Sequence, residues 1–269
     1  MTPEDIELFS QIVKKRSGLV VTPDKAYLLE SRLLPVARRH ELGDLAGLAQ
    51  ACRLGSREDL MEDITEAMTT NETFFFRDNG PFDRFKDDIL PPLLASRAST
   101  KKLRIWCAAA STGQAPYSLS IILMEMASQL AGWKVEIVGT DISNEALHKA
   151  KEGLYTQFEV QRGLPIQTLM KYFTQEEGGW RISQNIRQMV GYRPFNLLDD
   201  FNALGRFDIV FCRNVLIYFD ADDKRQILDR IRKQMPDDGS LFLGGAETVL
   251  GVSESFQATP NLRGVYTPT

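Results

Sequence analysis

The stretch Leu103–Ser120, LRIWCAAASTGQAPYSLS, decides the fold. Its first residues form an apolar run typical of a buried parallel strand, and small residues follow before the pattern becomes helical. The stretch Lys134–Asp141, KVEIVGTD, predicts a second strand that ends in an acid. In a unit of strand, small-residue loop and helix, the amides at the start of the helix point toward a bound ligand. An acid after the second strand can accept hydrogen bonds from a ribose diol. Because the loop lacks GxGxxG, these residues alone leave open both a nucleotide-type cofactor site and an ordinary βαβ unit.

The composition is that of an ordinary globular protein. The net charge of −4 carries no nucleic-acid signature. The start, MTPEDIELF, has no basic region typical of a signal peptide, and the most apolar run, SLSIILMEMA, is too short for a membrane span. Cys52, Cys107 and Cys212 form no CxxC pair and are interpreted as reduced core thiols, which favours the cytoplasm. With only His40 and His148, neither a histidine-based metal site nor a Ser-His-Asp triad is expected.

The first 68 residues predict only helices. Thr2-Pro3 is typical of a helix start, Gly18 should end that helix, and Pro35 should end or kink the next one. We therefore expect a separate all-α domain over residues 1–70. Its basic stretch has two interpretations, a solvated helix face or a docking surface for an acidic partner, and contains Arg32, Arg38, Arg39 and His40.

The rest of the chain alternates between strand and helix patterns, which predicts an α/β domain over residues 71–269 with a mostly parallel sheet. A helix over Asp83–Leu94 should close at Pro91-Pro92. Helices are also expected at Gln114–Ala131, Asn144–Glu152 and Ala221–Gln234, and strands at Leu103–Cys107, Lys134–Thr140, Met189–Pro194, Phe207–Cys212, Ser240–Gly245 and Val265–Pro268. A Gly178-Gly179 turn interrupts the rhythm and predicts a small antiparallel subdomain at about residues 172–193.

Two further motifs bear candidate site residues. Thr69–Arg77, TTNETFFFR, is either a buried connector or a segment whose aromatic rings hold Asn71, Thr73 and Arg77 at a cofactor. Phe207–Asp220, FDIVFCRNVLIYFD, starts as a buried strand and then turns polar. Four strand ends thus carry polar or small residues that should meet at one edge of the sheet, namely Ala109, Asp141, Asn196 and the pair Arg213-Asn214.

Taken together, TTNETFFFRD, CAAASTGQAPYSL, TDISNEALHKAKEGLY, FNLL and FDIVFCRNVLIYFD resemble the chemotaxis receptor methyltransferase family, of CheR type. The resemblance covers essentially the whole chain. It implies transfer of a methyl group from S-adenosylmethionine to glutamate side chains of chemoreceptor cytoplasmic domains, with S-adenosylhomocysteine as the product. It also implies a Rossmann-like methyltransferase domain with a small antiparallel β-subdomain, preceded by an all-α receptor-docking domain that contains Arg32, Arg38 and Arg39.

Family roles carry over to the matching positions of this sequence. The resemblance implies cofactor contacts from Asn71, Thr73, Arg77, Ala109, Asp141, Asn196, Leu197, Arg213 and Asn214. It places Tyr218 near the transferred methyl group and makes Tyr218 and Arg77 the candidate catalytic residues. From the composition we expect no metal, no nucleic-acid partner and no membrane insertion, and a regulatory protein is a further candidate partner.

Two departures from the family pattern matter. Ala115 stands where the family usually has glutamate, which predicts a lost cofactor contact and weaker affinity. The hairpin region around GGWRIS is shorter than in members that bind a pentapeptide at the receptor C-terminus, so independence of that pentapeptide is expected. Two alternatives stay open: a regulatory protein that binds the cofactor with little turnover, and a methyltransferase acting on another substrate. A dehydrogenase is disfavoured because the turn lacks the glycine fingerprint for a pyrophosphate.

Overall fold

The structure is a computed structural model and describes residues 1–55 and 57–269. The chain divides into two compact units. One unit comprises Met1–Thr70 with Tyr218–Asp223, and the other comprises Asn71–Ile217 with Lys224–Thr269.

The helical unit contains α1 (Pro3–Ser17), η1 (Pro23–Lys25), α2 (Ala26–Arg39), α3 (Leu45–Leu54) and α4 (Glu58–Met68). Helix α1 starts after Thr2 and ends at Gly18, as the sequence predicts. Thr2 and Asp5 form a reciprocal capping box at its start, and Gly18 is in the left-handed conformation. The apolar faces of the helices meet in one core that includes Phe9, Leu29 and Leu48. Pro35 does not end α2, which continues to Arg39.

The larger unit is built on a seven-stranded sheet with the order β6-β2-β1-β7-β8-β10-β9. The first five strands of this order pair in parallel, and β10 and β9 add an antiparallel edge. The strands are β1 (Lys102–Ala108), β2 (Lys134–Asp141), β6 (Val190–Pro194), β7 (Ile209–Cys212), β8 (Ser240–Leu243), β9 (Phe256–Ala258) and β10 (Val265–Pro268). Every residue of β7 and β8 is buried, which is typical of parallel strands covered on both faces.

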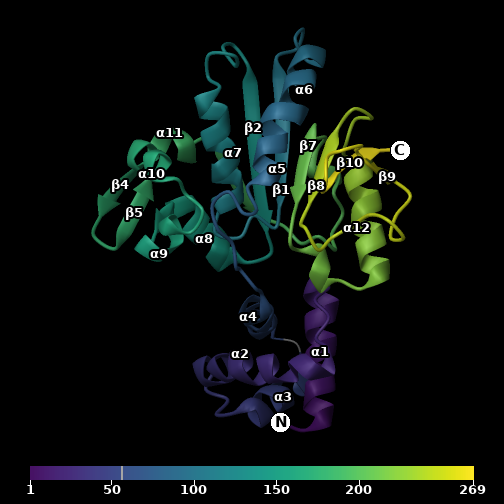
Figure 1. Cartoon of the computed structure of the whole chain (residues 1–269). Helices are drawn as coiled ribbons and strands as arrows, with labels where there is room; N and C mark the ends of the chain where they lie inside the picture. Colours follow the sequence, from purple (N-terminus) through teal and green to yellow (C-terminus); the bar gives the residue numbers. More distant parts are fainter. Residues whose placement is uncertain (56) are drawn as a thin grey trace. The chain divides into compact units, whose positions relative to one another are not determined.

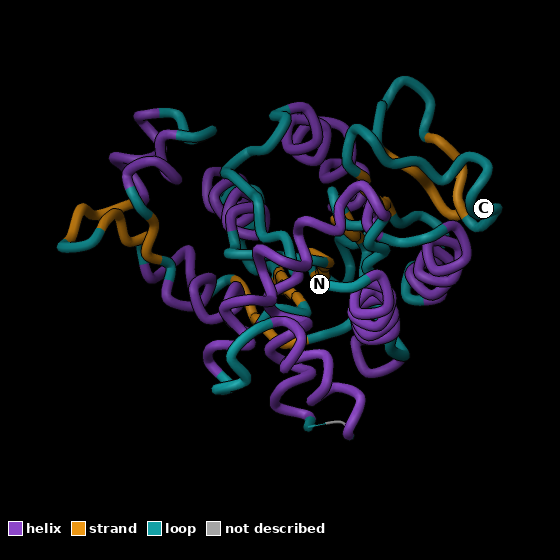
Figure 2. Tube along the Cα trace, turned by 90° about the horizontal axis from the view of Figure 1, so that it is seen from below, coloured by secondary structure: helices purple, strands orange, loops and turns teal. Residues whose placement is uncertain are grey.

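A second sheet has three antiparallel strands in the order β3-β5-β4. Its strands are β3 (Leu154–Tyr155), β4 (Phe173–Glu176) and β5 (Gly179–Ile182), and the short helices near it are α9 (Gln157–Gln161), α10 (Ile166–Tyr172) and α11 (Gln184–Arg187). Figure 1 shows this group on the α7 side of the larger sheet, and Figure 2 shows its strands standing apart from those of that sheet. The antiparallel excursion predicted at the Gly178-Gly179 turn is confirmed.

The helices of the larger unit are α5 (Gly80–Arg84), η2 (Phe85–Ile89), α6 (Leu90–Ser96), α7 (Gln114–Glu125), α8 (Asn144–Glu152) and α12 (Ala221–Lys233), with short turns η3 (Asn202–Leu204) and η4 (Leu216–Tyr218). The expected helix end at Pro91-Pro92 is wrong. A π-helical turn, η2, leads directly into α6, which contains both prolines in its first turn and continues to Ser96. Helix α7 ends at Glu125 rather than Ala131, because i→i+3 bonds such as Ala127 N–H to the Met124 carbonyl replace the helical pattern.

Aromatic side chains fill both faces of the larger sheet. On one face Phe75, Phe82 and Phe211 join the main core. On the other face the Trp106 ring lies 5.5 Å from Phe207, and its indole N–H donates to Thr140 Oγ1 over 2.9 Å. Burial on both sides fixes the strands, and with them the positions of the loops at their carboxyl ends.

Candidate active site at the carboxyl edge of the sheet

Four neighbouring parallel strands end at the same edge of the sheet. Ala108 of β1 pairs with Thr140 of β2 and with Cys212 of β7, and Asp141 pairs with Pro194 of β6. The residues that end or follow these strands are therefore placed together at one edge, as expected from the sequence, and they are Ala109, Asp141, Asn196 and Arg213-Asn214. In an open α/β sheet this edge is where ligands bind.

Asp141 is the buried acid of this edge, with 6% of its surface exposed. Its Oδ2 accepts the Ser111 amide over 2.7 Å, and its Oδ1 accepts the Ser143 amide over 2.9 Å. A carboxylate can accept several hydrogen bonds at once, so one side chain can hold two loops. Asp141 therefore ties the loop after β1 to the loop after β2.

The loop after β1 has an unusual backbone. Ala109 and Ser111 have φ values of 56° and 50°, and Gly113 has φ 96°. A Cβ at Gly113 would also lie 2.8 Å from the Tyr192 hydroxyl oxygen, so both conformation and space require glycine there. Ala115, the second residue of α7, is half-buried and packs against the main core. The small side chains of this loop let a ligand approach the backbone.

The segment Asn71–Arg77 lies against this loop. The Asn71 carbonyl accepts from Ser111 Oγ over 3.0 Å, and Asn71 Nδ2 donates to Ser143 Oγ over 3.4 Å. Phe75 is fully buried in the core of the larger unit. Phe75 therefore anchors the segment, which both interpretations of TTNETFFFR require. Thr73 is half-buried between these anchors.

Arg213 is almost fully buried, with 7% of its side chain exposed. It donates to Asp78 Oδ2 over 2.6 Å and to the Arg77 carbonyl over 3.1 Å. Desolvation lowers the pKa of Arg213 from its usual value, and the neighbouring Arg77 charge adds to this, while Asp78 opposes it. The Arg77 guanidinium donates to the Glu72 carbonyl over 3.0 Å. In the structure Arg213 thus holds a carboxylate of its own chain.

The remaining predicted cofactor residues follow β6 and β7. Asn196 Oδ1 accepts the Leu198 amide over 3.0 Å, and the Phe195 amide donates to the Asp141 carbonyl over 2.9 Å. Leu197 is buried. Asn214 has φ 59°, a conformation that asparagine tolerates better than most residues.

Tyr218 and the predicted docking arginines belong to the helical unit. The Tyr218 carbonyl accepts the Val20 amide over 2.9 Å, and its side chain is half-buried in η4. Arg32 donates to the Met68 and Thr69 carbonyls, each over 2.9 Å, so its guanidinium caps the end of α4. Arg39 pairs with Asp63 over 3.2 Å, and Arg38 is exposed. Arg38 and Arg39 present charge at the surface, whereas Arg32 stabilises the fold.

Sequence reasoning missed Glu247. This acid follows β8 and is buried, and its carboxylate accepts four backbone amides, those of Asn214, Val215, Leu216 and Gly244. An acid shortly after the apolar strand Ser240–Leu243, in GGAET, was the available signal. It lay beyond the motifs that carry the resemblance.

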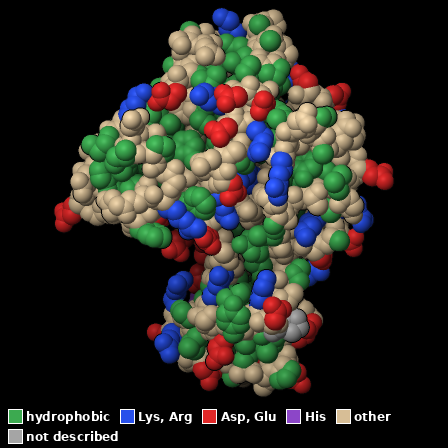
Figure 3. Space-filling model, viewed as in Figure 1, with side chains coloured by type: hydrophobic (Ala, Val, Ile, Leu, Met, Phe, Trp, Pro, Cys, Tyr) green, Lys and Arg blue, Asp and Glu red, His purple; other side chains and the backbone are tan. Residues whose placement is uncertain are grey.

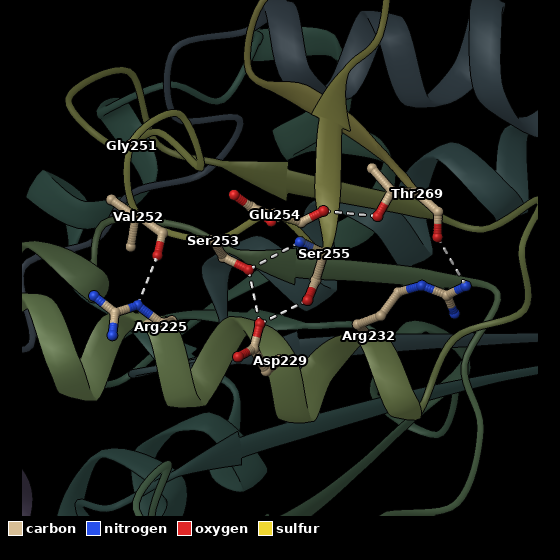
Figure 4. A pocket seen from close by; sticks show the side chains of 9 residues that line it. All are labelled: Arg225, Asp229, Arg232, Gly251, Val252, Ser253, Glu254, Ser255 and Thr269. Carbon is tan, nitrogen blue, oxygen red and sulfur yellow. Dashed lines mark hydrogen bonds between the residues drawn. The ribbon is translucent and has the colours of Figure 1, made fainter.

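A separate groove lies between α12 and the C-terminal strands, and none of its lining residues is a predicted site residue. Figure 4 shows that its polar side chains pair with one another and with the chain around them. Asp229 Oδ1 accepts from Ser253 Oγ over 2.7 Å and from Ser255 Oγ over 2.6 Å, and Arg232 donates to the Thr269 carbonyl over 3.3 Å. These bonds fasten the C-terminal segment to α12.

Charge on the surface is mixed. On the face shown in Figure 3, basic and acidic side chains are interspersed over the larger unit. Among residues 1–55 and 57–269, no three or more His, Cys, Asp and Glu side chains are grouped to hold a metal ion. Within the same ranges no helix has the length and apolar character needed to span a bilayer. Cys107 and Cys212 are buried free thiols, and Cys52 is half-buried.

The fold and this edge define an α/β protein of Rossmann-like type, with an acid after the second strand placed for a nucleoside cofactor. Comparison with known proteins gives the family. Residues 71–265 match the family described as CheR methyltransferase, SAM binding domain, and residues 4–69 match the CheR methyltransferase all-alpha domain. The chain belongs to the CheR family of chemotaxis methyltransferases. It is an S-adenosylmethionine-dependent methyltransferase.

Named relatives agree with this assignment. Chemotaxis protein methyltransferase Cher2 of Pseudomonas putida is 40% identical over 257 residues, which cover 94% of this chain and 93% of the relative. Chemotaxis protein methyltransferase 1 of Pseudomonas aeruginosa is 41% identical over the same length, with the same coverage. Among solved structures, PKMT2 from Rickettsia typhi matches with a TM-score of 0.39 and 17% identity, over 65% of this chain and 26% of that one.

The residues at the edge fit S-adenosylmethionine. Asp141 is a buried acid at the end of the second strand of the βαβ unit, where such folds hold a ribose, and the loop of Ala109 and Ser111 carries small rather than bulky side chains. Leu197 supplies a buried apolar surface that suits an adenine ring. The acid and the small loop are the features that an adenosyl ligand needs at this edge.

Proposed function

We propose that this protein transfers the methyl group of S-adenosylmethionine to glutamate side chains on the cytoplasmic domains of chemoreceptors. The membership in the CheR family carries the proposal. A glutamate carboxylate is ionised at neutral pH and is already a nucleophile, so the enzyme needs no general base. The two histidines fit this, because His40 bonds to Asp63 and His148 is exposed. An enzyme with this substrate works in the cytoplasm.

When bound, S-adenosylmethionine supplies a methyl group attached to a sulfonium sulfur, and this sulfur leaves as a neutral thioether. The reaction forms one carbon–oxygen bond and breaks one carbon–sulfur bond, and no proton is moved. The chain's own residues therefore bind, align and exclude water, and such alignment contributes on the order of 7–11 kcal/mol in favourable cases. We assign the ribose to Asp141, the adenine to Asn196 and Leu197, and the sulfonium edge to Arg213 and Asn214. Asn71, Thr73 and Arg77 are assigned to the methionine end and adenine side of the cofactor, and Ala109 to a backbone contact.

We also propose that the enzyme does not need a pentapeptide at the receptor C-terminus. Strands β4 and β5 pair Glu176 with Gly179, so only Glu177 and Gly178 join them. A two-residue turn leaves no long loop beside this hairpin. We propose that Arg38 and Arg39 contact an acidic surface of the receptor. We also expect a regulatory protein partner, which the methyl-transfer assay and the Tyr218 variant do not test.

Labelled methyl transfer tests the substrate. Receptor cytoplasmic fragments incubated with methyl-labelled S-adenosylmethionine should take up label that mild base releases as methanol, because carboxylate esters hydrolyse under these conditions. Fragments without their C-terminal tail should be labelled at a similar rate. Base-stable label would indicate another acceptor, and S-adenosylhomocysteine binding without any label would favour a regulatory protein. Labelling that needs the tail would contradict pentapeptide independence alone.

Tyr218→Phe should lower turnover much more than cofactor affinity. The resemblance places Tyr218 near the transferred methyl group, where its hydroxyl would align the acceptor, and a misplaced acceptor costs about 100-fold in rate. We expect a kcat lower by about that factor, with a Kd for S-adenosylhomocysteine within twofold of the parent. Tyr172→Phe is the matched control, because that hydroxyl bonds to Glu125, away from the carboxyl edge. An unchanged kcat in Tyr218→Phe would remove this residue from the site.

A further inference from the structure

Glu247 has four hydrogen-bond donors directed at one carboxylate. Its Oε1 accepts the amides of Val215 over 2.9 Å and Leu216 over 2.7 Å. Its Oε2 accepts the amides of Asn214 over 2.7 Å and Gly244 over 2.6 Å. The residue is 8% exposed, so water is largely kept from these bonds. Hydrogen bonds to an ionised acceptor are the strong ones, and four of them fix both partners.

Three of the four amides belong to consecutive residues of one turn. This turn follows β7, begins at Asn214 in the left-handed conformation and ends at Leu216 in η4. Successive amides that converge in this way form a concave nest for an anion. Here the anion is a side chain of the protein, and the fourth amide, that of Gly244, joins the end of β8 to the same point.

The packing around Gly244 shows how closely the turn is held. A Cβ at this position would lie 2.7 Å from Asn214 Nδ2 and 2.7 Å from Glu247 Oε2. The Asn214 side chain and the Glu247 carboxylate therefore both lie against the Gly244 backbone, with no room for a larger residue there. The preceding residue, Arg213, is fixed on its other side by Asp78.

We propose that Glu247 is a positioning residue of the methyltransferase site, which holds Arg213 and Asn214 at the cofactor through the backbone of their turn. It does not touch the reacting atoms. The inference rests on the proposed cofactor role of Arg213 and Asn214. An acid is needed because both carboxylate oxygens accept two amides each. A glutamine would turn an NH2 group toward two of the four amides, whichever way its side chain is placed.

Glu247→Gln tests the proposal by titration with S-adenosylhomocysteine and by steady-state kinetics. We expect the Kd to rise at least about 10-fold, with a matching rise in the KM for S-adenosylmethionine. The matched control is Glu136→Gln, which removes an acid of β2 that pairs with Arg104 over 2.7 Å, in a part of the strand away from its carboxyl end. The control should lower the thermal midpoint and leave the Kd unchanged.

Gly244→Ala disturbs the same turn without changing charge, and it decides the question if Glu247→Gln does not fold. It should also raise the Kd. A Glu247→Gln protein that loses stability like the control but keeps the parental Kd and KM would overturn the proposal. Asn214→Ala separates two claims, that this turn binds the cofactor and that Glu247 positions the turn. If that variant weakens binding and Glu247→Gln does not, only the positioning role fails. If neither weakens binding, the proposed cofactor site at this turn fails.

Discussion

Asp141→Asn is expected to weaken S-adenosylhomocysteine binding by about 100-fold. We assign the Asp141 carboxylate to the two hydroxyls of the ribose, and a hydrogen bond to a charged group contributes about 1.5–3 kcal/mol. Loss of about 3 kcal/mol corresponds to roughly 100-fold in Kd. Asparagine also replaces one of the two oxygens that accept the Ser111 and Ser143 amides, so either the loop after β1 or the loop after β2 loses an anchor. Calorimetric titration of the folded variant measures the change.

Asp208→Asn is the matched control for this experiment. Asp208 also accepts a backbone amide, that of Arg104, over 2.9 Å, and it also has a second partner, Arg97. It lies immediately before β7, at the amino end of the parallel strands. The control should lower stability and leave the Kd within twofold. If Asp141→Asn binds within threefold of the parent, Asp141 does not hold the ribose, and the cofactor assignment at the carboxyl edge is wrong.

The parallel sheet could be predicted because its signals are local. Strands buried on both faces are short apolar runs, and the expected runs at Leu103, Lys134 and Ser240 correspond to β1, β2 and β8. Parallel neighbours place their carboxyl ends together, so the edge that brings Asp141 and Arg213 together follows from strand order. The antiparallel strands β3 and β9 were not predicted, because two- and three-residue strands carry too little periodicity to detect.

The contacts around the site could not be predicted, because they depend on distant backbone. Nothing local shows that Glu247 accepts amides more than 30 residues earlier, or that Arg32 donates to the end of α4. The basic stretch with Arg32 has the same composition whether its side chains face solvent or cap a helix. Likewise, the π-helical turn at Phe85–Ile89 buries Phe85 and Ile89 in the core, and no local pattern marks it. The sequence indicates residue types at the site, and tertiary packing assigns their partners.

Phe75→Ala is expected to lower the free energy of unfolding by about 3–5 kcal/mol. The side chain is fully buried, and its ring lies 5.0 Å from that of Tyr155 and 5.5 Å from that of Phe173. A Cβ at Gly163 would lie 1.9 Å from the Phe75 carbonyl oxygen, so the backbone at Phe75 is also enclosed. The cavity cannot readily collapse, and the thermal midpoint should fall by about 10 °C.

Phe74→Ala is the matched control, because it makes the same change one residue earlier on a half-buried ring. Phe74 lies under the guanidinium groups of Arg162, at 4.3 Å, and Arg77, at 5.5 Å, and such contacts contribute only about 1 kcal/mol near a surface. Because Phe75 anchors the segment that holds Asn71, Phe75→Ala should also weaken S-adenosylhomocysteine binding at a temperature where it is folded, and Phe74→Ala should do so less. Equal losses of stability in the two variants would show that Phe75 is no anchor. In that case the positions of Asn71 and Thr73 would need another explanation.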